Sequence, residues 1–162
     1  MQVPEPTAEH HWLQKLVGEW TCEADCQTAP DQPVEKVTGT DSVTSLGKLW
    51  VICRGDGEVP GSGDRNHSIL TLGFDPLKKK FVGSFVASVM TYFWPYEGTL
   101  DASGKKLELA SEGPSFSGKP EFDQYLDVIE MITDDHRTLT SHTRDENGQW
   151  KPFMTMHYYR KK

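Results

Sequence analysis

The chain has 162 residues, with 17 Lys and Arg against 24 Asp and Glu, and a formal net charge of −7. This length fits a single domain with one core over residues 1–162, and the acidic balance argues against nucleic acid or an anionic membrane surface as a partner. The sequence shows neither a long apolar run nor a basic region followed by an apolar one near its start. Neither a membrane-spanning helix nor a signal peptide is therefore predicted, and the expected location is the cytoplasm.

A short helix is predicted near the N-terminus, over residues 8–16. Thr7 can cap this helix, and Trp12 and Leu16 lie on one apolar stripe at helical spacing. Gly18 is expected to end it, because the hydrophobic pattern changes to a period of two immediately afterwards.

The rest of the chain is predicted to form strands separated by turns. The first strand alternates Trp20, Cys22, Ala24 and Cys26 with polar residues, and a loop is expected over residues 28–33. Further strands are predicted over residues 36–46, 49–59, 68–74, 80–92, 96–100, 105–112, 125–133, 138–144 and 150–160. Successive strands joined by short turns are typical of an antiparallel meander, and closure removes its two exposed edges. The predicted fold class is all-β, an up-and-down barrel of about ten strands with a short N-terminal helix.

The cysteines are predicted to be free. Cys22 and Cys26 lie on one strand, so their Cα atoms would be about 13 Å apart, whereas a disulfide needs less than about 7 Å. They are interpreted as small apolar core residues. No Cys-x-x-Cys pair or histidine partner stands at zinc-ligand spacing, so a zinc site is not expected. No other metal or cofactor is predicted.

Several segments resemble a known family. The "LVGEW" stretch is similar to the Gly-x-Trp signature that opens the first strand of lipocalins and the related calycins. The segments "HHWLQKLVGEW", "LGKLWV", "ILTLGFDPLKKKFVGSFVASVMTYFWPYEGTLD", "SEGPSF" and "KPFMTMHYYRK" together resemble an uncharacterised bacterial group of lipocalin-like proteins, domain of unknown function 1579 (DUF1579).

The resemblance implies a barrel floor plugged by the helix, with Trp20 just above it. It also implies an arginine packed across the indole, with Arg160 as the candidate and Arg137 as the substitute. Such a contact adds a cation–π attraction of roughly 1–2 kcal/mol. The resemblance brings no established reaction.

A barrel of this size has room for one small ligand. Over residues 81–94 both faces are largely apolar, so the periodicity leaves open which of them points inward. If Ser84, Ser88 and Met90 face inward, they leave space and offer two hydroxyls. The alternative is a tightly packed core strand.

A buried acid is predicted on the strand over residues 125–133, where Tyr125 and Asp127 share one face. A buried carboxylate needs a partner, and Arg137, one hairpin later, is the expected partner of Asp127. Such a pair often has only a structural role, here the fixing of strand register.

The orientation of His157 depends on the last turn. A two-residue type I′ turn would place Thr138 opposite His157, whereas a type I turn with a glycine bulge would place Arg137 there. Asp145 and Gly148 favour the bulged turn, which groups on one face Arg137, Leu139, Ser141, Phe153 and His157. The resemblance also suggests a haem ligand at His157, because distant haem-binding calycins use a late-strand histidine. An adjacent arginine disfavours that role and would suit an anionic ligand group.

The leading hypothesis is a barrel that binds a small, partly apolar molecule, with an anionic group as an option. The candidate ligand-binding residues are Ser84, Ser88, Met90, Tyr125, Asp127, Arg137, Phe153 and His157. One alternative is an enzyme with Asp127 or His157 as general base. The aromatic residues around Pro95, which include Trp94 and Tyr96, are predicted to form either a cavity rim or a dimer contact. Another alternative is therefore a filled structural barrel, in which Trp94 and Tyr96 form a homodimer contact.

Overall fold

The computed structural model describes residues 1–26 and 31–162 and contains one short helix followed by strands. The elements are α1 (Ala8–Gln14), β1 (Gly18–Cys26), β2 (Glu35–Leu46), β3 (Trp50–Glu58), β4 (Arg65–Asp75), β5 (Lys80–Ala87), β6 (Trp94–Leu100), β7 (Lys106–Pro114), β8 (Phe122–Thr133), β9 (His136–Arg144) and β10 (Trp150–Arg160). Part of the loop predicted over residues 28–33, residues 28–30, lies outside the described residues.

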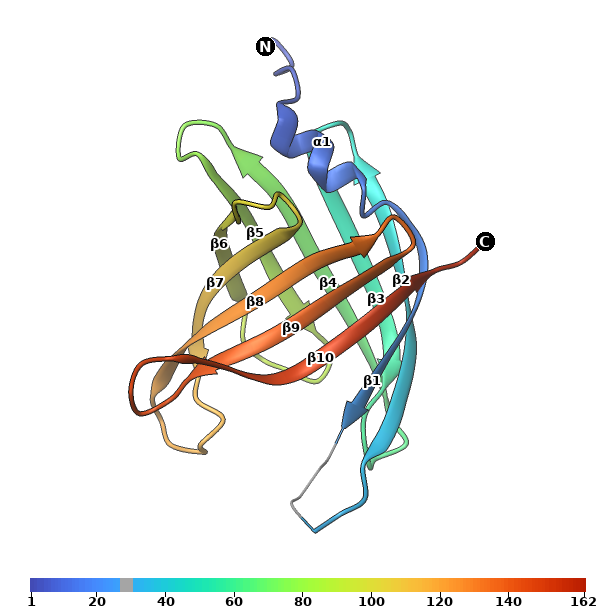
Figure 1. Ribbon diagram of the computed structural model, residues 1–162, viewed down its shortest axis with the longest axis vertical. Coiled ribbons are helices and arrows are strands. Elements are labelled where there is room, and N and C mark those ends of the chain that lie inside the picture. The colour runs from blue at the N-terminus through green and yellow to red at the C-terminus, as the bar shows by residue number, and fades with distance from the viewer. Residues whose placement is uncertain (27–30) are drawn as a thin grey trace.

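The strands form one closed antiparallel barrel, in which β1 pairs with both β2 and β10 (Figure 1). The closing pairs include Trp20 opposite Arg160 and Cys22 opposite Tyr158. Every other strand pairs with its neighbours in the sequence. Closure leaves no unpaired edge, and the predicted all-β up-and-down barrel with a short N-terminal helix is confirmed.

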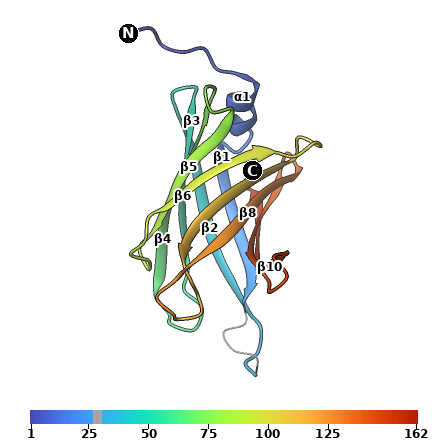
Figure 2. The same cartoon turned by 90° about the vertical axis from the view of Figure 1, so that its left-hand side faces the viewer.

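Helix α1 lies across one end of the barrel, and hairpin loops lie at the far end (Figures 1 and 2). Leu13 of the helix and Leu16 just after it are fully buried, and the Trp12 indole donates a hydrogen bond to the carbonyl of Gly104 at 2.8 Å. The backbone N–H of Thr7, at the N-cap, donates to His10 Nδ1 at 2.9 Å. The helix is therefore a plug that is held by packing and by hydrogen bonds at both its start and its middle.

Trp20 forms the floor next to this plug. Its side chain is fully buried, and its Nε1–H donates to the carbonyl of Leu16 at 2.9 Å. Both arginines considered from the sequence lie over the ring, Arg160 at 4.2 Å and Arg137 at 4.8 Å from guanidinium carbon to ring centroid. Arg160 also donates to the carbonyl of Val17 at 2.7 Å. It therefore ties the last strand to the segment that follows the helix.

The predicted strand over residues 80–92 is too long, because β5 ends at Ala87. The N–H of Met90 donates to the carbonyl of Ala87 at 3.1 Å, which turns the chain into a loop over residues 88–93. Within β5 the inward face carries Phe81, whose ring contacts that of Trp12 at 6.1 Å between centroids. Packing against the helix thus selects the face that the periodicity left undecided.

Within residues 1–26 and 31–162, no helix combines the length and the apolar character needed to cross a membrane.

Candidate ligand-binding cavity

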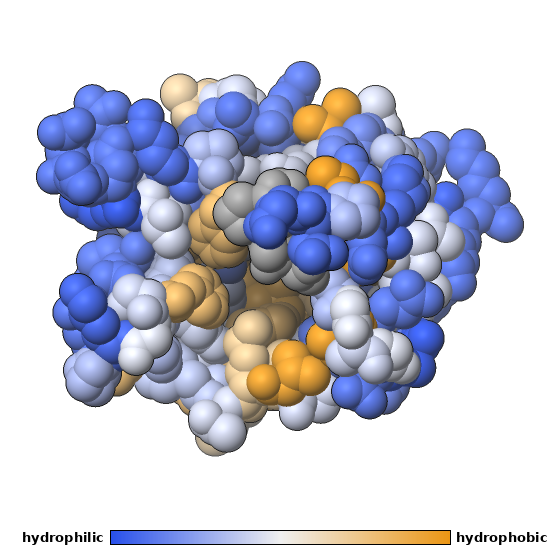
Figure 3. All heavy atoms as spheres, turned by 90° about the horizontal axis from the view of Figure 1, so that it is seen from below, coloured by the Kyte–Doolittle hydropathy of each residue, from blue (hydrophilic) through white to orange (hydrophobic). Residues whose placement is uncertain are grey.

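A cavity of about 340 Å³ lies inside the barrel and opens at the end opposite α1 (Figure 3). Its wall is mostly apolar, with Leu70, Phe85, Met90, Trp94, Leu109, Phe116, Leu139, Phe153, Met154 and Met156. The space remains because several inward residues are small, namely Cys22, Cys53, Gly55, Ser68, Ser111 and Ser141. The barrel is therefore hollow in its open half and packed in its α1 half.

A buried ion pair lies at the inner end of the cavity. Arg137 Nη2 donates to Asp41 Oδ2 at 2.5 Å, and both side chains are almost completely buried. The guanidinium also lies over the ring of Tyr158, 3.8 Å from its centroid. Burial raises the pKa of Asp41, and the charge and hydrogen bond of Arg137 oppose that rise.

The predicted pairing of Arg137 with Asp127 is wrong. Asp127 lies opposite Ser141 on β9, whereas Arg137 lies opposite Met131. Arg137 and Ser141 are four positions apart, which corresponds to roughly 13 Å along a strand, beyond the reach of an ion pair. Arg137 instead pairs with Asp41 of β2, which is separated from β9 by β10 and β1 in the closed barrel.

Asp127 has neutral hydrogen-bond partners. The hydroxyl of Tyr96 donates to its Oδ2, and the hydroxyl of Ser141 makes a second hydrogen bond. Burial raises the pKa of Asp127, and these two hydrogen bonds oppose the rise. Burial and the nearby carboxylate together raise the pKa of Tyr96. Among the described residues, no Lys or Arg lies within 4.0 Å of the Asp127 carboxylate.

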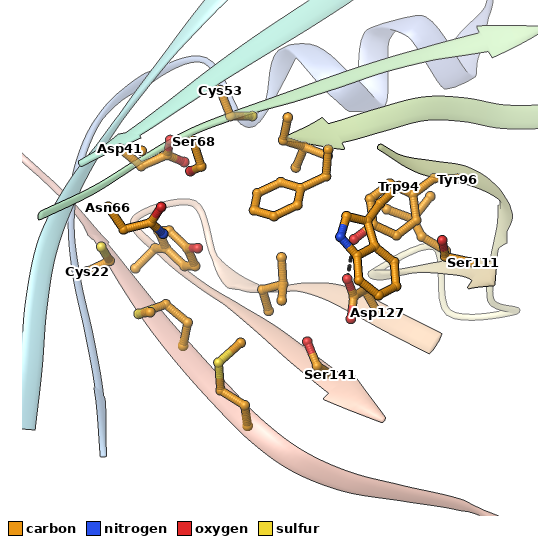
Figure 4. Close-up of a pocket in the computed structure, with 18 of the residues that line it drawn as sticks. Cys22, Asp41, Cys53, Asn66, Ser68, Trp94, Tyr96, Ser111, Asp127 and Ser141 are labelled. Atoms are coloured by element: carbon orange, nitrogen blue, oxygen red, sulfur yellow. Dashed lines mark hydrogen bonds between the residues drawn. The ribbon is translucent and has the colours of Figure 1, made fainter. Parts of the chain in front are cut away.

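Aromatic rings surround the outer part of the cavity. The Trp94 ring meets Tyr125 edge to face at 5.3 Å and lies 6.5 Å from Phe116 between centroids. The indole fits because Gly113 has no side chain, as a Cβ there would lie 2.1 Å from the Trp94 ring. Figure 4 shows the nitrogen edge of Trp94 turned toward the middle of the cavity, and this buried N–H has no hydrogen-bond partner in the described part of the chain.

The structure brings five of the eight candidate ligand-binding residues to the cavity wall. These are Met90, Tyr125, Asp127, Arg137 and Phe153. Ser84 and Ser88 do not line it. Ser84 lies on the face of β5 that points away from the cavity, where its Oγ is 2.8 Å from Thr71 Oγ1 of β4. Ser88 Oγ accepts the backbone N–H of His67 at 2.9 Å.

His157 lies on the outside of the barrel. The bulged turn predicted before it does form, with the Gly148 N–H donating to the Asp145 carbonyl at 2.9 Å and Gly148 at φ 74°. A second bulge between Pro152 and Met154 then shifts the register, so that His157 lies opposite Thr138.

The outward histidine stacks on other rings. Its Nδ1 lies 3.0 Å from Nε2 of His136, and its ring is stacked with that of Tyr159. His157 therefore reaches neither a ligand nor a haem iron inside the cavity, and of the two candidate general bases only Asp127 lines it. Among the described residues, no group of three His, Cys, Asp or Glu is placed to hold a metal ion.

The expected dimer contact is also corrected. Trp94 and Tyr96 are both 8% exposed and line the cavity, because they lie on the buried face of β6, where buried and exposed residues alternate. Rings that are buried in this way offer no surface to a second chain.

Asp41 is the site residue that the sequence reasoning missed. The signal was present, since β2 alternates Val37, Gly39, Asp41 and Val43 on one face, and this acid is the only charged member of an otherwise apolar set. The pairing of Tyr96 with Asp127 carried no comparable signal, because the two residues lie on strands 31 positions apart.

The burial of the cysteines predicts their order of reaction with a thiol reagent. Burial raises the pKa of Cys22 to about 11 and that of Cys53 to about 12, while Cys26 lies nearer the surface with a raised pKa. Since the thiolate is the reacting form, we expect Cys26 to react first at pH 8 and Cys53 only after unfolding. Peptide mass spectrometry after timed alkylation, with and without guanidinium chloride, measures this order. Alkylation of Cys53 in the folded protein as fast as that of Cys26 would contradict it.

A closed up-and-down barrel, with a helix and a tryptophan at its floor and one open end, is the fold that the resemblance to lipocalin-like proteins implied. The family described as protein of unknown function (DUF1579) matches residues 5–160, and the chain belongs to this family. The resemblance to DUF1579 seen in the sequence is thereby confirmed.

Two solved structures show the same fold. Rv2717c from M. tuberculosis has a TM-score of 0.63 at 12% identity, over 98% of this chain and 100% of that one. The S-type phycobiliprotein lyase CPES from Guillardia theta has a TM-score of 0.56 at 13% identity, over 96% of this chain and 94% of that one. At these identities the likeness concerns the fold alone. None of the curated protein sequences matches the chain.

Proposed function

We propose that this barrel binds a small, partly apolar molecule in its interior. The carrying observation is the cavity of about 340 Å³ with a mostly apolar wall and one open end. Cavities of this size and character are typical of small-molecule sites. A barrel built only for stability would gain from filling the space, because buried voids forfeit packing contacts.

The unpartnered indole N–H of Trp94 supports a ligand that carries a hydrogen-bond acceptor. A buried donor without a partner costs about 1–3 kcal/mol, and this one lies in the cavity wall. An oxygen or nitrogen atom on the ligand would remove that cost. The ligand is therefore apolar over most of its surface and polar at a few positions.

We do not extend the proposal to an anionic ligand. An anionic ligand would need an arginine without another acidic partner, whereas Arg137 is already paired with Asp41. The wall also contains the carboxylates of Asp56 and Asp127. Since Asp56 pairs with Arg65, an added anion would meet the unpaired carboxyl of Asp127 and, in the described part of the wall, no unpaired arginine, in a place where water screens it poorly.

A fluorescence titration with N-phenyl-1-naphthylamine tests the proposal, because this neutral dye emits strongly only in apolar surroundings. We expect saturable binding to the wild-type protein and an affinity at least about tenfold lower in Leu139→Trp, which fills the cavity, a loss of about 1.4 kcal/mol. Thr140→Trp is the matched control, since Thr140 is the next residue of β9 and bonds outward to Thr155 at 3.2 Å.

The control variant should bind the dye as the wild type does, and both variants should keep the circular dichroism of the wild type. Absence of saturable binding to the folded wild-type protein would refute the proposal. So would equal affinity in Leu139→Trp and the wild type.

A further inference from the structure

We propose that the molecule bound in the cavity is an organic cation, a partly aromatic amine whose ammonium group pairs with Asp127. This rests on the proposed function and adds to it the charge of the ligand and the residue that recognises it. Three features of the described residues point the same way: an acid without a cation, rings beside that acid, and an excess of acids at the open end.

The first feature is that Asp127 differs from the other acids of the cavity wall. Asp41 pairs with Arg137, and Asp56 accepts a hydrogen bond from Arg65 Nε at 2.8 Å. Asp127 has no such cation within ion-pair distance in the described part of the chain. It accepts from the hydroxyl of Tyr96, and burial raises its pKa, so that a cation beside it would favour the ionised form. A carboxylate held in an apolar cavity is costly unless a positive charge joins it.

The second feature is the aromatic surroundings. Figure 4 shows Trp94 and Tyr96 on the same side of the cavity as Asp127. Phe116 and Tyr125 complete this side, with their rings 5.3 Å apart between centroids. An ammonium group is attracted to the faces of such rings, by about 2 kcal/mol or more when water is excluded. The apolar part of an aromatic amine also fits between them.

The third feature is the charge of the open end. The loops that join β1 to β2, β3 to β4, β5 to β6, β7 to β8 and β9 to β10 all lie at this end (Figure 1). In their described part, these loops carry Asp31, Asp64, Glu121, Asp145 and Glu146 but only one basic residue, Lys119. The tight turn at the α1 end between β4 and β5 instead contains Lys78 and Lys79. A field of this sign raises the local concentration of cations at the cavity mouth.

The test uses three naphthalenes that share one ring system and differ in head group. They are 1-naphthylmethylamine, which is cationic at pH 7, the neutral 1-naphthalenemethanol and the anionic 1-naphthoate. Each displaces N-phenyl-1-naphthylamine from the wild-type protein in a competition titration. We expect the amine to bind at least about tenfold more tightly than the alcohol, and the naphthoate to bind most weakly.

The variant Asp127→Asn removes the charge and keeps the shape. It should abolish the advantage of the amine over the alcohol while changing the affinity for the neutral dye less than about threefold. Asp56→Asn is the matched control, because Asp56 also lines the cavity but already pairs with Arg65. This control should leave the advantage of the amine within about threefold of the wild-type value.

The outcomes separate the two proposals. Binding of the dye without any preference for the amine over the alcohol overturns the proposal of a cationic ligand and leaves the proposed small-molecule site intact. Absence of dye binding overturns both proposals. An unchanged preference for the amine in a folded Asp127→Asn variant overturns the role of Asp127. If that variant does not fold, the wild-type comparison of amine with alcohol still decides whether the cavity selects a cation.

Discussion

The variant Trp20→Ala will lose about 3–5 kcal/mol of unfolding free energy, the range measured for large aromatic residues removed from protein cores. The side chain is fully buried, and two guanidinium groups lie over its ring. Its removal leaves a cavity at the barrel floor and deprives the carbonyl of Leu16 of its hydrogen bond from Nε1. For a protein of this length, such a loss lowers the melting temperature by roughly 10 °C. Thermal and urea unfolding monitored by circular dichroism measure both quantities.

Trp50→Ala is the matched control, because Trp50 lies on β3 with 39% of its surface exposed. Its loss should cost less than that of Trp20, because more than a third of its surface already lies in water and its removal leaves no enclosed cavity. A Trp20→Ala variant as stable as Trp50→Ala would show that the floor of the barrel does not depend on the indole.

The variant Arg137→Met will lose about 3–5 kcal/mol of unfolding free energy, since it leaves the carboxylate of Asp41 buried without its cation. Arg137 is also in contact with the rings of Trp20 and Tyr158. The double variant Asp41→Asn with Arg137→Met carries no unpaired charge and should regain part of this loss. Urea unfolding of the wild type, both single variants and the double variant gives the coupling energy of the pair. A double variant less stable than Arg137→Met would contradict this account.

The cost of Arg137→Met should also depend on pH. Burial raises the pKa of Asp41, and the charge and hydrogen bond of Arg137 oppose that rise. Without the arginine, the pKa of Asp41 therefore rises further. Below the ordinary range of aspartate, Asp41 is protonated in both the folded and the unfolded variant, so the cost is smallest there. As the pH rises, the unfolded chain releases the proton before the folded one, and the variant loses stability. Unfolding curves between pH 4 and pH 8 measure the trend, and Asp41→Asn with Arg137→Met should not show it.

Local signals were sufficient for most of the strand pattern. The alternation after Gly18 predicted β1, and Asp145 with Gly148 predicted the bulged turn before β10. These features depend on neighbours within a few residues, either through side-chain alternation or through the backbone angles of a turn. They are readable without any knowledge of the tertiary structure.

The candidate site was less predictable, and His157 shows why. The turn before it was predicted correctly, but an unpredicted bulge between Pro152 and Met154 moved every later residue of β10 to the other face. Side chains alternate with a period of two, so one extra residue reverses the orientation of all those that follow. A bulge of this kind bends the strand to follow the curvature of the closed sheet, and that curvature cannot be read from the sequence of one strand.

The composition, the alternating strands and the turn residues by themselves determined an all-β meander, with a helix and Trp20 at its start. Only the tertiary structure decided what the interior contains. Closure of the sheet brought Asp41 and Arg137 together across 96 positions, and the contact of Phe81 with the helix turned Ser84 outward. Alternation and turns are properties of short segments, whereas the contents of a cavity depend on which distant side chains the barrel brings to the same level.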